Sequence, residues 1–248
     1  MTGAGPRVAR LLALAALLSG AAPAAAHDPP EPLPPCSYDD RPARIVPPDD
    51  GRWTVLDTVF ALPERWRPDD LVPVRQAGLP DDRLVRALIV PDLRAMVEDA
   101  AAAGVRFRLW SAFRSGPVQA DTFDSWSARL GREAALRVSA RPGHSEHQLG
   151  TAIDLGAADG PAPWDLDDFG VTPEGAWLID HAWRYGFVLS YPRGAEDRAC
   201  YAYEPWHWRW VGREVAQRIH ASGALPREAL WAWREELAAD VDAGGAEP

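Results

Sequence analysis

Apolar side chains recur at helical spacing in several parts of the chain. In the segment "PDLRAMVEDAAAAG", residues 91–104, Leu93, Met96 and Ala100 fall on one face of a helix, and a glycine ends the pattern. Proline near the start and glycine beyond the end mark a second helix, and Thr172 is placed to cap a third. On these grounds we predict helices over residues 91–104, 117–131, 172–186, 212–221 and 226–241.

Strand-like segments lie between these helices. The segment "VRFRLWSAF" (105–113) alternates between apolar and polar residues, and both "GFVLSY" (186–191) and the aromatic "YEPWHWRWV" (203–211) are typical of strands. Helices and short strands follow one another without a regular βαβ rhythm. The sequence therefore predicts an α+β fold, in which a small antiparallel sheet carries the functional site and is flanked by helices.

The first residues have the pattern of a secretory signal peptide. Arg7 and Arg10 precede a short apolar run (11–18), and small residues follow up to Ala26, after which we expect cleavage. A membrane anchor is the alternative, but the run is too short to cross ~30 Å of hydrocarbon. We therefore expect residues 1–26 to be removed and the protein to be secreted or held in the cell envelope, with no membrane span after cleavage.

The remainder is predicted to be an arm followed by one domain. Residues 27–52 are rich in proline and aspartate, which favours an extended arm, and residues 53–241 are of a length that a single domain accounts for. Residues 242–248 are expected to be a disordered tail. The net charge is −10, or −12 without the two leader arginines. Such a charge argues against nucleic acid and anionic membranes as partners, and we expect a monomer.

The chain has two cysteines, Cys36 and Cys200. An exported protein with an even number of cysteines most often pairs them, which would tie the arm to the segment just before Glu204. Zinc ligation by either cysteine is the alternative, but neither lies in a C-x-x-C or similar cluster. The disulfide is the prediction we prefer.

The stretch "RPGHSEHQLGTAIDL" (141–155) holds the first candidates for a metal site. His147 and Asp154 are seven residues apart, and Asp154 lies in an apolar run where an unpaired carboxylate would be costly to bury. A salt bridge to an arginine is the alternative explanation for Asp154. His144 lies close to both residues, and spacing alone does not assign it.

A third candidate ligand and a candidate base lie in "YEPWHW". A regular strand would point Glu204 and His207 to opposite faces, but Pro205 favours a bend that could bring both to one site. Two imidazoles and a carboxylate are a ligand set that zinc accepts, with a fourth position open to water, and Glu204 could then take a proton from that water. A buried histidine on its own is more often structural than a ligand. The other histidines are assigned structural or surface roles: His27, His181 and His220.

One arginine is a candidate for the electropositive part of the site. Arg114 follows a predicted strand, on a short loop before a helix. It could bind a substrate carboxylate or stabilise an oxyanion through charge-assisted hydrogen bonds. The alternative is an ordinary solvated arginine.

Taken in order, these segments resemble the VanY-type D-alanyl-D-alanine carboxypeptidases, which belong to the LAS group of metallopeptidases that cut bacterial cell-wall peptides. The resemblance rests on "SAFRS" followed by Gln119, on S-x-H-x-x-G-x-A-x-D from Ser145 to Asp154, and on E-x-W-H from Glu204 to His207. The likeness runs from about residue 53 to residue 220. The ordered set is far more specific than any one of its parts.

The resemblance implies a zinc ion as cofactor and a peptidoglycan stem peptide as substrate. The implied reaction is hydrolysis of the terminal D-Ala-D-Ala bond by an exported zinc carboxypeptidase. The residues at the family's positions are the zinc ligands His147, Asp154 and His207, the general base Glu204, Arg114 for the oxyanion or the substrate, and the peptide contacts Gln119 and Ser145. His144 matches a residue that the family does not use as a ligand.

Three other functions stay open on the sequence. An endopeptidase or an L,D-carboxypeptidase of the same fold would use the same zinc chemistry. A non-catalytic wall-binding module is the third hypothesis, but such a protein would have no need for Glu204. Phe113 stands where many relatives have tyrosine, and "SGPVQ" (115–119) has an unusual Gly-Pro. Both departures bear on substrate preference rather than on catalysis.

Overall fold

The computed structural model describes residues 1–3, 31–45 and 51–242. The compact fold begins at Pro32. The predicted signal peptide falls outside these ranges apart from its first three residues, as does His27. Among the described residues, no helix is long and apolar enough to cross a membrane.

The described part of the chain alternates short strands with helices. The strands are β1 (Arg41–Pro42), β2 (Phe60–Ala61), β3 (Leu71–Pro73), β4 (Leu84–Arg86), β5 (Phe107–Ser111), β6 (Ala152–Ala157), β7 (Phe187–Leu189) and β8 (His207–Trp210). The α-helices are α1 (Val90–Ala102), α2 (Gly116–Leu130), α3 (Arg132–Val138), α4 (Pro173–His181), α5 (Glu196–Ala199), α6 (Arg213–Ser222) and α7 (Pro226–Asp242). Short 3₁₀ helices are η1 (Val74–Ala77), η2 (Ala87–Ile89), η3 (Glu146–Leu149), η4 (Pro163–Asp165), η5 (Phe169–Val171) and η6 (Ala182–Tyr185).

A four-stranded antiparallel sheet in the order β5-β6-β8-β7 forms the centre of the fold. On β6, Asp154 lies opposite His207 of β8 and Ser111 of β5. This sheet, with helices around it, confirms the predicted α+β class. Two-stranded pairings are formed by β1 with β2 (parallel) and by β3 with β4 (antiparallel).

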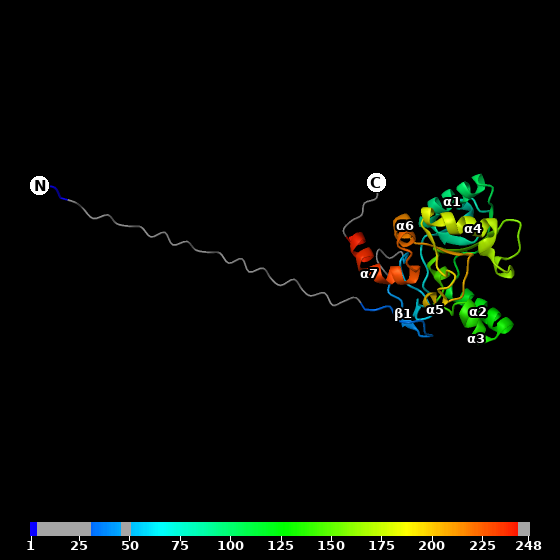
Figure 1. Ribbon diagram of the computed structural model, residues 1–248. Helices are drawn as coiled ribbons and strands as arrows, with labels where there is room; N and C mark the ends of the chain where they lie inside the picture. The colour runs from blue at the N-terminus through cyan, green and yellow to red at the C-terminus, as the bar shows by residue number, and fades with distance from the viewer. Residues whose placement is uncertain (4–30, 46–50, 243–248) are drawn as a thin grey trace. The chain divides into compact units, whose positions relative to one another are not determined.

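The sheet has one apolar face and one polar face, because successive side chains of a strand point to opposite sides. Ile153, Leu155 and Trp208 belong to the main core, which also includes residues of α1 and α4. Figure 1 shows α1 and α4 on one side of the sheet and α2 and α3 on the other. The alternate residues, Asp154 and His207, therefore face the side of α2 and α3.

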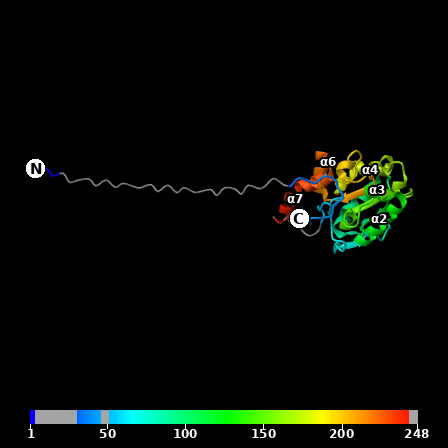
Figure 2. The same ribbon diagram turned by 90° about the horizontal axis from the view of Figure 1, so that it is seen from below.

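Most predicted helices are confirmed, with ends shifted by a few residues. The Thr172 hydroxyl accepts a hydrogen bond from Gly175 N–H at 3.1 Å and caps α4, but the predicted helix over 172–186 divides into α4 and η6. Helix α3 was not predicted, because Ala135 is the one residue of this short helix that is buried and no apolar stripe marks it. Figure 2 shows α2 and α3 together and α6 and α7 on the opposite side of the fold.

The strand predicted over residues 203–211 begins only at His207. His207 N–H donates to the Glu204 carbonyl at 3.0 Å, so the chain turns at Pro205 before the strand starts. This is the bend that the sequence favours at Pro205, and it lets Glu204 lie on the same side as His207.

The described part of the arm is attached to the domain. Strand β1 pairs with β2, and Ala43 and Ile45 pack against a small apolar cluster that contains Leu149. Cys36 and Cys200 form a disulfide with an S–S distance of 2.06 Å, which is the pairing expected from the sequence.

Candidate active site

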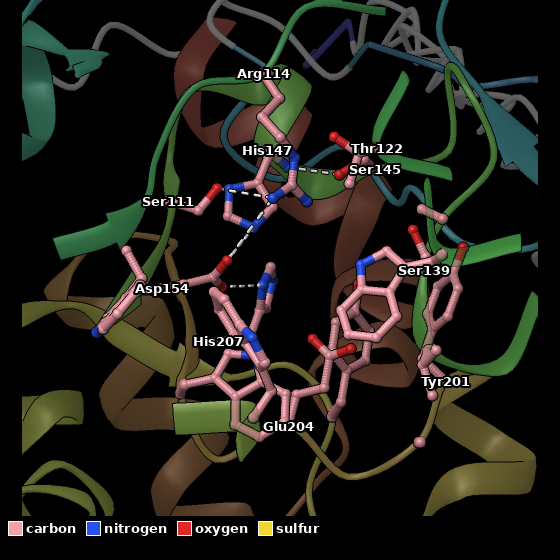
Figure 3. A pocket seen from close by; sticks show the side chains of 18 of the residues that line it. Ser111, Arg114, Thr122, Ser139, Ser145, His147, Asp154, Tyr201, Glu204 and His207 are labelled. Carbon is pink, nitrogen blue, oxygen red and sulfur yellow. Dashed lines mark hydrogen bonds and ion pairs between the residues drawn. The ribbon is translucent and has the colours of Figure 1, made fainter. Parts of the chain in front are cut away.

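Three side chains from three elements meet on the polar face of the sheet. His147 lies on η3, Asp154 on β6 and His207 at the start of β8, and all three are buried. One Asp154 oxygen (Oδ2) lies 3.2 Å from His147 Nε2, and the other (Oδ1) lies 3.1 Å from His207 Nδ1. Figure 3 shows both imidazoles beside the Asp154 carboxylate, each joined to it by a dashed line.

The remaining ring nitrogen of each histidine is held by an acceptor. His147 Nδ1 lies 2.8 Å from the Ala112 carbonyl oxygen, and His207 Nε2 lies 2.9 Å from Glu146 Oε2. A carbonyl and a carboxylate only accept, so each of these nitrogens carries a hydrogen. The nitrogens that face Asp154 are therefore the ones available to a metal.

The three donor atoms fit a tetrahedral zinc ion. Ligands about 2.0–2.1 Å from zinc are about 3.3 Å apart in a tetrahedral site. His147 Nε2 lies 3.2 Å from Asp154 Oδ2 and His207 Nδ1 lies 3.1 Å from Asp154 Oδ1, and one donor atom from each of the three residues lies within 4.8 Å of the others, which is close enough to share one ion. Two imidazoles and a carboxylate leave one of four positions open, as catalytic zinc sites require. His147, Asp154 and His207 are therefore the residues that could hold the metal.

Glu146 supports this group and was not predicted from the sequence. Its Oε2 accepts hydrogen bonds from His207 and from the Ser190 hydroxyl (2.6 Å), while its Oε1 accepts from Arg209 Nη1 at 2.7 Å. Arg209 is 1% exposed, and its Nη2 donates to two backbone carbonyls, of Arg52 and Thr54. A buried guanidinium thus fixes the carboxylate that fixes His207.

The buried charges shift the pKa values of the site. Burial works against the ionised form of Glu146, but the charge of Arg209 and the hydrogen bonds from His207 and Ser190 together outweigh burial and lower the pKa of Glu146 to about 2. Burial likewise lowers the pKa of His207, but the hydrogen bonds that its ring donates to Asp154 and Glu146, with the charges of these carboxylates, outweigh burial and raise this pKa to about 10. Burial and the nearby Arg114 charge lower the pKa of His147 to about 4.

Glu204 lies beside the three donors and is not one of them. Its backbone N–H donates to the Tyr191 carbonyl at 3.1 Å, which fixes the turn before β8, and its side chain points into the pocket (Figure 3). Loss of hydration raises the pKa of Glu204 to about 8, and the Asp154 charge adds to this shift. A carboxylate with a pKa near neutrality is well suited to take up and return a proton.

Arg114 occupies the opposite side of the site. Its Nη1 donates to Ser111 Oγ at 2.7 Å and lies 3.8 Å from Asp154 Oδ2, so part of the salt-bridge alternative for Asp154 is realised. Its Nε donates to Gln119 Oε1 at 2.9 Å, and Gln119 Nε2 donates to the Ala140 carbonyl at 2.7 Å. Gln119 is fully buried and does not line the pocket, so its observed contacts hold Arg114 in position.

The other candidates from the sequence fall into two groups. Ser145 lines the pocket, and its hydroxyl caps η3 by accepting from His147 N–H at 3.3 Å. His144 is bound away from the donors, with Nδ1 2.6 Å from the Asp57 carbonyl and Nε2 3.0 Å from Asp40 Oδ1. Phe113 lines the pocket without a polar group.

A cavity of about 590 Å³ opens over the donors. The sequence did not indicate most of its lining residues, many of which are aromatic and come from distant segments. Its aromatic lining residues are Trp110, Phe113, Trp126, Trp164, Tyr191, Tyr201, Tyr203 and Trp206. A site of this size, with a few polar groups in an apolar wall, is typical of a pocket for a medium-sized ligand.

Known proteins share this fold and sequence. The chain is 34% identical over 170 residues to the Bacillus subtilis (strain 168) protein YodJ, covering 66% of this chain and 62% of that relative, less than two thirds of its length. The solved structure of the vancomycin-resistance D,D-pentapeptidase VanY from a VanB-type cassette, in complex with Zn(II), has a TM-score of 0.62 and 27% identity, covering 72% of this chain and 98% of that one. The LdcB LD-carboxypeptidase structure has a TM-score of 0.62 and 31% identity, with coverages of 71% and 83%.

One family model matches the segment that contains the whole site. Residues 82–213, just over half of the 248-residue chain, match the VanY model, described as D-alanyl-D-alanine carboxypeptidase. The matched segment contains the three donors, Glu204 and Arg114. The chain therefore belongs to the VanY family of D-alanyl-D-alanine carboxypeptidases.

Proposed function

We propose that the protein is an exported zinc peptidase that hydrolyses the terminal D-Ala-D-Ala bond of peptidoglycan stem peptides. The observation that carries this proposal is the buried group of two imidazoles and a carboxylate beside a separate glutamate whose pKa is raised. The zinc in the related VanY structure supports His147, Asp154 and His207 as zinc ligands here.

The residues of this chain divide the chemistry among them. Bound zinc supplies a Lewis acid that polarises the scissile carbonyl and lowers the pKa of water towards ~7. Glu204 accepts the proton of the attacking water and donates it to the amine that leaves. Arg114, held by Ser111 and Gln119, directs its positive charge at the oxyanion that develops on the carbonyl.

Export of the protein is part of this proposal. The leader pattern at residues 1–26 supports it, as does the Cys36–Cys200 disulfide, because such bonds persist in oxidising compartments. Peptidoglycan stem peptides are reached on that side of the membrane. Ser145, which lines the pocket, is proposed to contact the peptide.

A second candidate activity is L,D-carboxypeptidase. It is favoured by one comparison, since the LdcB LD-carboxypeptidase is 31% identical to this chain and the D,D-pentapeptidase VanY is 27% identical. Both activities would use the same donors and the same base. They differ in the stereochemistry of the residue before the scissile bond.

The two activities are distinguished by incubating the zinc-loaded protein with synthetic stem peptides and identifying the products by mass spectrometry. A pentapeptide ending in D-Ala-D-Ala should lose a single D-Ala, and the Glu204→Gln variant should release none while it still binds zinc. A tetrapeptide whose terminal D-Ala follows a residue of L configuration is the second substrate. Its cleavage, with the pentapeptide left intact, would assign the L,D activity instead. Zinc bound at one per chain with neither peptide cleaved would contradict both.

A further inference from the structure

Helix α2 presents a row of side chains to the cavity at a regular spacing. Val118, Thr122, Trp126 and Leu130 are four residues apart and all line the cavity that contains the metal donors. Residues four apart lie along one side of a helix, so these four form a single stripe, which we call the α2 stripe. Its length is about 18 Å, at about 1.5 Å per residue.

The α2 stripe is more apolar and more exposed than packing within the domain requires. Val118 is 49% exposed and Leu130 is 46% exposed, and few large apolar side chains of the described residues are so open. The face of α2 that packs into the domain is a different one and carries Gln119 and Phe123. The stripe is therefore available to something outside the described fold.

Other apolar groups line the same cavity as the stripe. Val138, Ala140 and Tyr201 belong to its walls, and Figure 3 shows Thr122, Ser139 and Tyr201 on the side of the pocket away from Asp154. The cavity thus continues from the donors into an apolar groove. The α2 stripe, about 18 Å long, matches the length of about five residues of an extended peptide, at about 3.3 Å per residue.

A cation lies at the far end of this stripe. The Arg129 guanidinium stacks over the Trp126 ring, 4.8 Å from its centroid, in the last turn of α2. Arg129 is exposed and is therefore accessible to a carboxylate of a bound peptide. The cavity thus offers an apolar surface for small side chains, and Arg129, which does not line the cavity itself, places a positive charge beside Trp126 for an acidic side chain.

We propose that the α2 stripe binds the part of the stem peptide that precedes the scissile bond, as an extended acidic chain. This inference rests on the proposed function. A carboxypeptidase releases a single small residue, so a surface as long as the stripe is available to the chain on the other side of the bond. The stripe then makes the enzyme select long peptides over short ones, and Trp126 is a specificity-determining residue.

The test compares two substrates of different length in zinc-loaded protein. Trp126→Ala should lower the ratio of kcat/KM for the pentapeptide to kcat/KM for N-acetyl-D-Ala-D-Ala by roughly tenfold or more, the range expected for one lost apolar contact. Val118→Ser should lower the same ratio less. Val171→Ser is the matched control, because Val171 is 78% exposed and does not line the cavity, and it should leave the ratio unchanged.

A binding measurement separates this inference from the proposed function. In the Glu204→Gln background, calorimetry with the pentapeptide reports affinity without turnover, and Trp126→Ala should weaken that affinity by roughly tenfold. If no peptide is cleaved but this loss of affinity is found, peptide binding by the α2 stripe is supported and the proposed reaction is refuted. Equal kcat/KM ratios for the two substrates in wild type and Trp126→Ala, together with equal peptide affinities, would refute peptide binding by the α2 stripe. A defect confined to glycan-linked substrates would also overturn it, since the stripe would then bind sugar.

Discussion

The carboxylate of Glu146 joins a buried guanidinium to a metal-binding imidazole, and its replacement by glutamine is the sharpest test of the site. Glu146 Oε1 accepts a hydrogen bond from Arg209 Nη1 at 2.7 Å. Glu146 Oε2 accepts hydrogen bonds from His207 Nε2 at 2.9 Å and from the Ser190 hydroxyl at 2.6 Å. Glutamine has nearly the same shape but only one oxygen. One of the two sides must therefore meet an NH₂ group.

Each orientation of the glutamine has a cost that the structure defines. With the amide oxygen towards His207, the NH₂ group faces the Arg209 guanidinium, donor against donor, and a buried charge loses its partner. With the oxygen towards Arg209, the NH₂ group faces His207 Nε2, and the ring must move its proton to Nδ1, the atom that faces Asp154. That tautomer blocks the nitrogen proposed to bind zinc.

The expected effects are large in both stability and metal binding. Removing one partner of a buried ion pair costs about 3–5 kcal/mol, so Glu146→Gln should lower the free energy of unfolding by that amount. Loss of the group that orients a metal-binding histidine lowers metal affinity by about 10- to 100-fold. Zinc affinity should therefore fall by that factor even in the fully folded variant.

Urea unfolding measures the first quantity and titration against a chelator of known affinity measures the second. Glu133→Gln is the matched control, because it makes the same chemical change at an exposed position on α3. It should change neither value. A Glu146→Gln variant that binds zinc as tightly as the wild type would refute the role assigned to Glu146.

Three further predictions concern the proton, the oxyanion group and the disulfide. Without metal the pKa of His207 is about 10, so this ring is cationic at pH 7 and zinc must displace at least one proton when it binds. Calorimetry in buffers of different ionisation enthalpy should detect the released proton. The apparent zinc affinity should also rise with pH below about 10. Proton-neutral binding would contradict this assignment. Arg114→Lys keeps the positive charge but loses the planar guanidinium whose Nε and Nη1 donate to Gln119 and Ser111, so kcat should fall by about 10²-fold with zinc affinity unchanged. An unaltered kcat would contradict a role of Arg114 in catalysis. Cys36→Ser should lower the free energy of unfolding by about 2–5 kcal/mol in urea, and an unchanged midpoint would show that the arm adds nothing to stability.

Local patterns in the sequence predicted the α+β class and most helices, and they made His147, Asp154 and His207 candidate donors. Spacing placed His147 and Asp154 in one segment, and Pro205 indicated the bend that brings Glu204 beside His207. Asp154 and His207 are neighbours only because β6 and β8 pair in one register, which no local pattern specifies. The family resemblance supplied that long-range information.

Glu146 could not be recognised in the same way. A glutamate between a capping serine and a histidine at the start of a short helix is expected to be exposed, and it is 6% exposed here. Its burial depends on Arg209, 63 residues away, and on Ser190. Arg209 alternates with tryptophans in "HWRW" and is typical of an outward-facing strand position. Side-chain partners so distant in sequence leave no trace in either segment alone.

Some supports of the site lie outside the segment that matches the family model. Arg209 is held by the carbonyls of Arg52 and Thr54, which precede residue 82, where the family match begins. The loop that leads to Glu204 is linked through Cys200 to Cys36. A protein trimmed to residues 82–213 would keep every donor and Glu146, but the buried Arg209 would lose the two carbonyls that accept from its Nη2. The part of the chain that must stay intact to support the site is therefore larger than the segment that the family model matches.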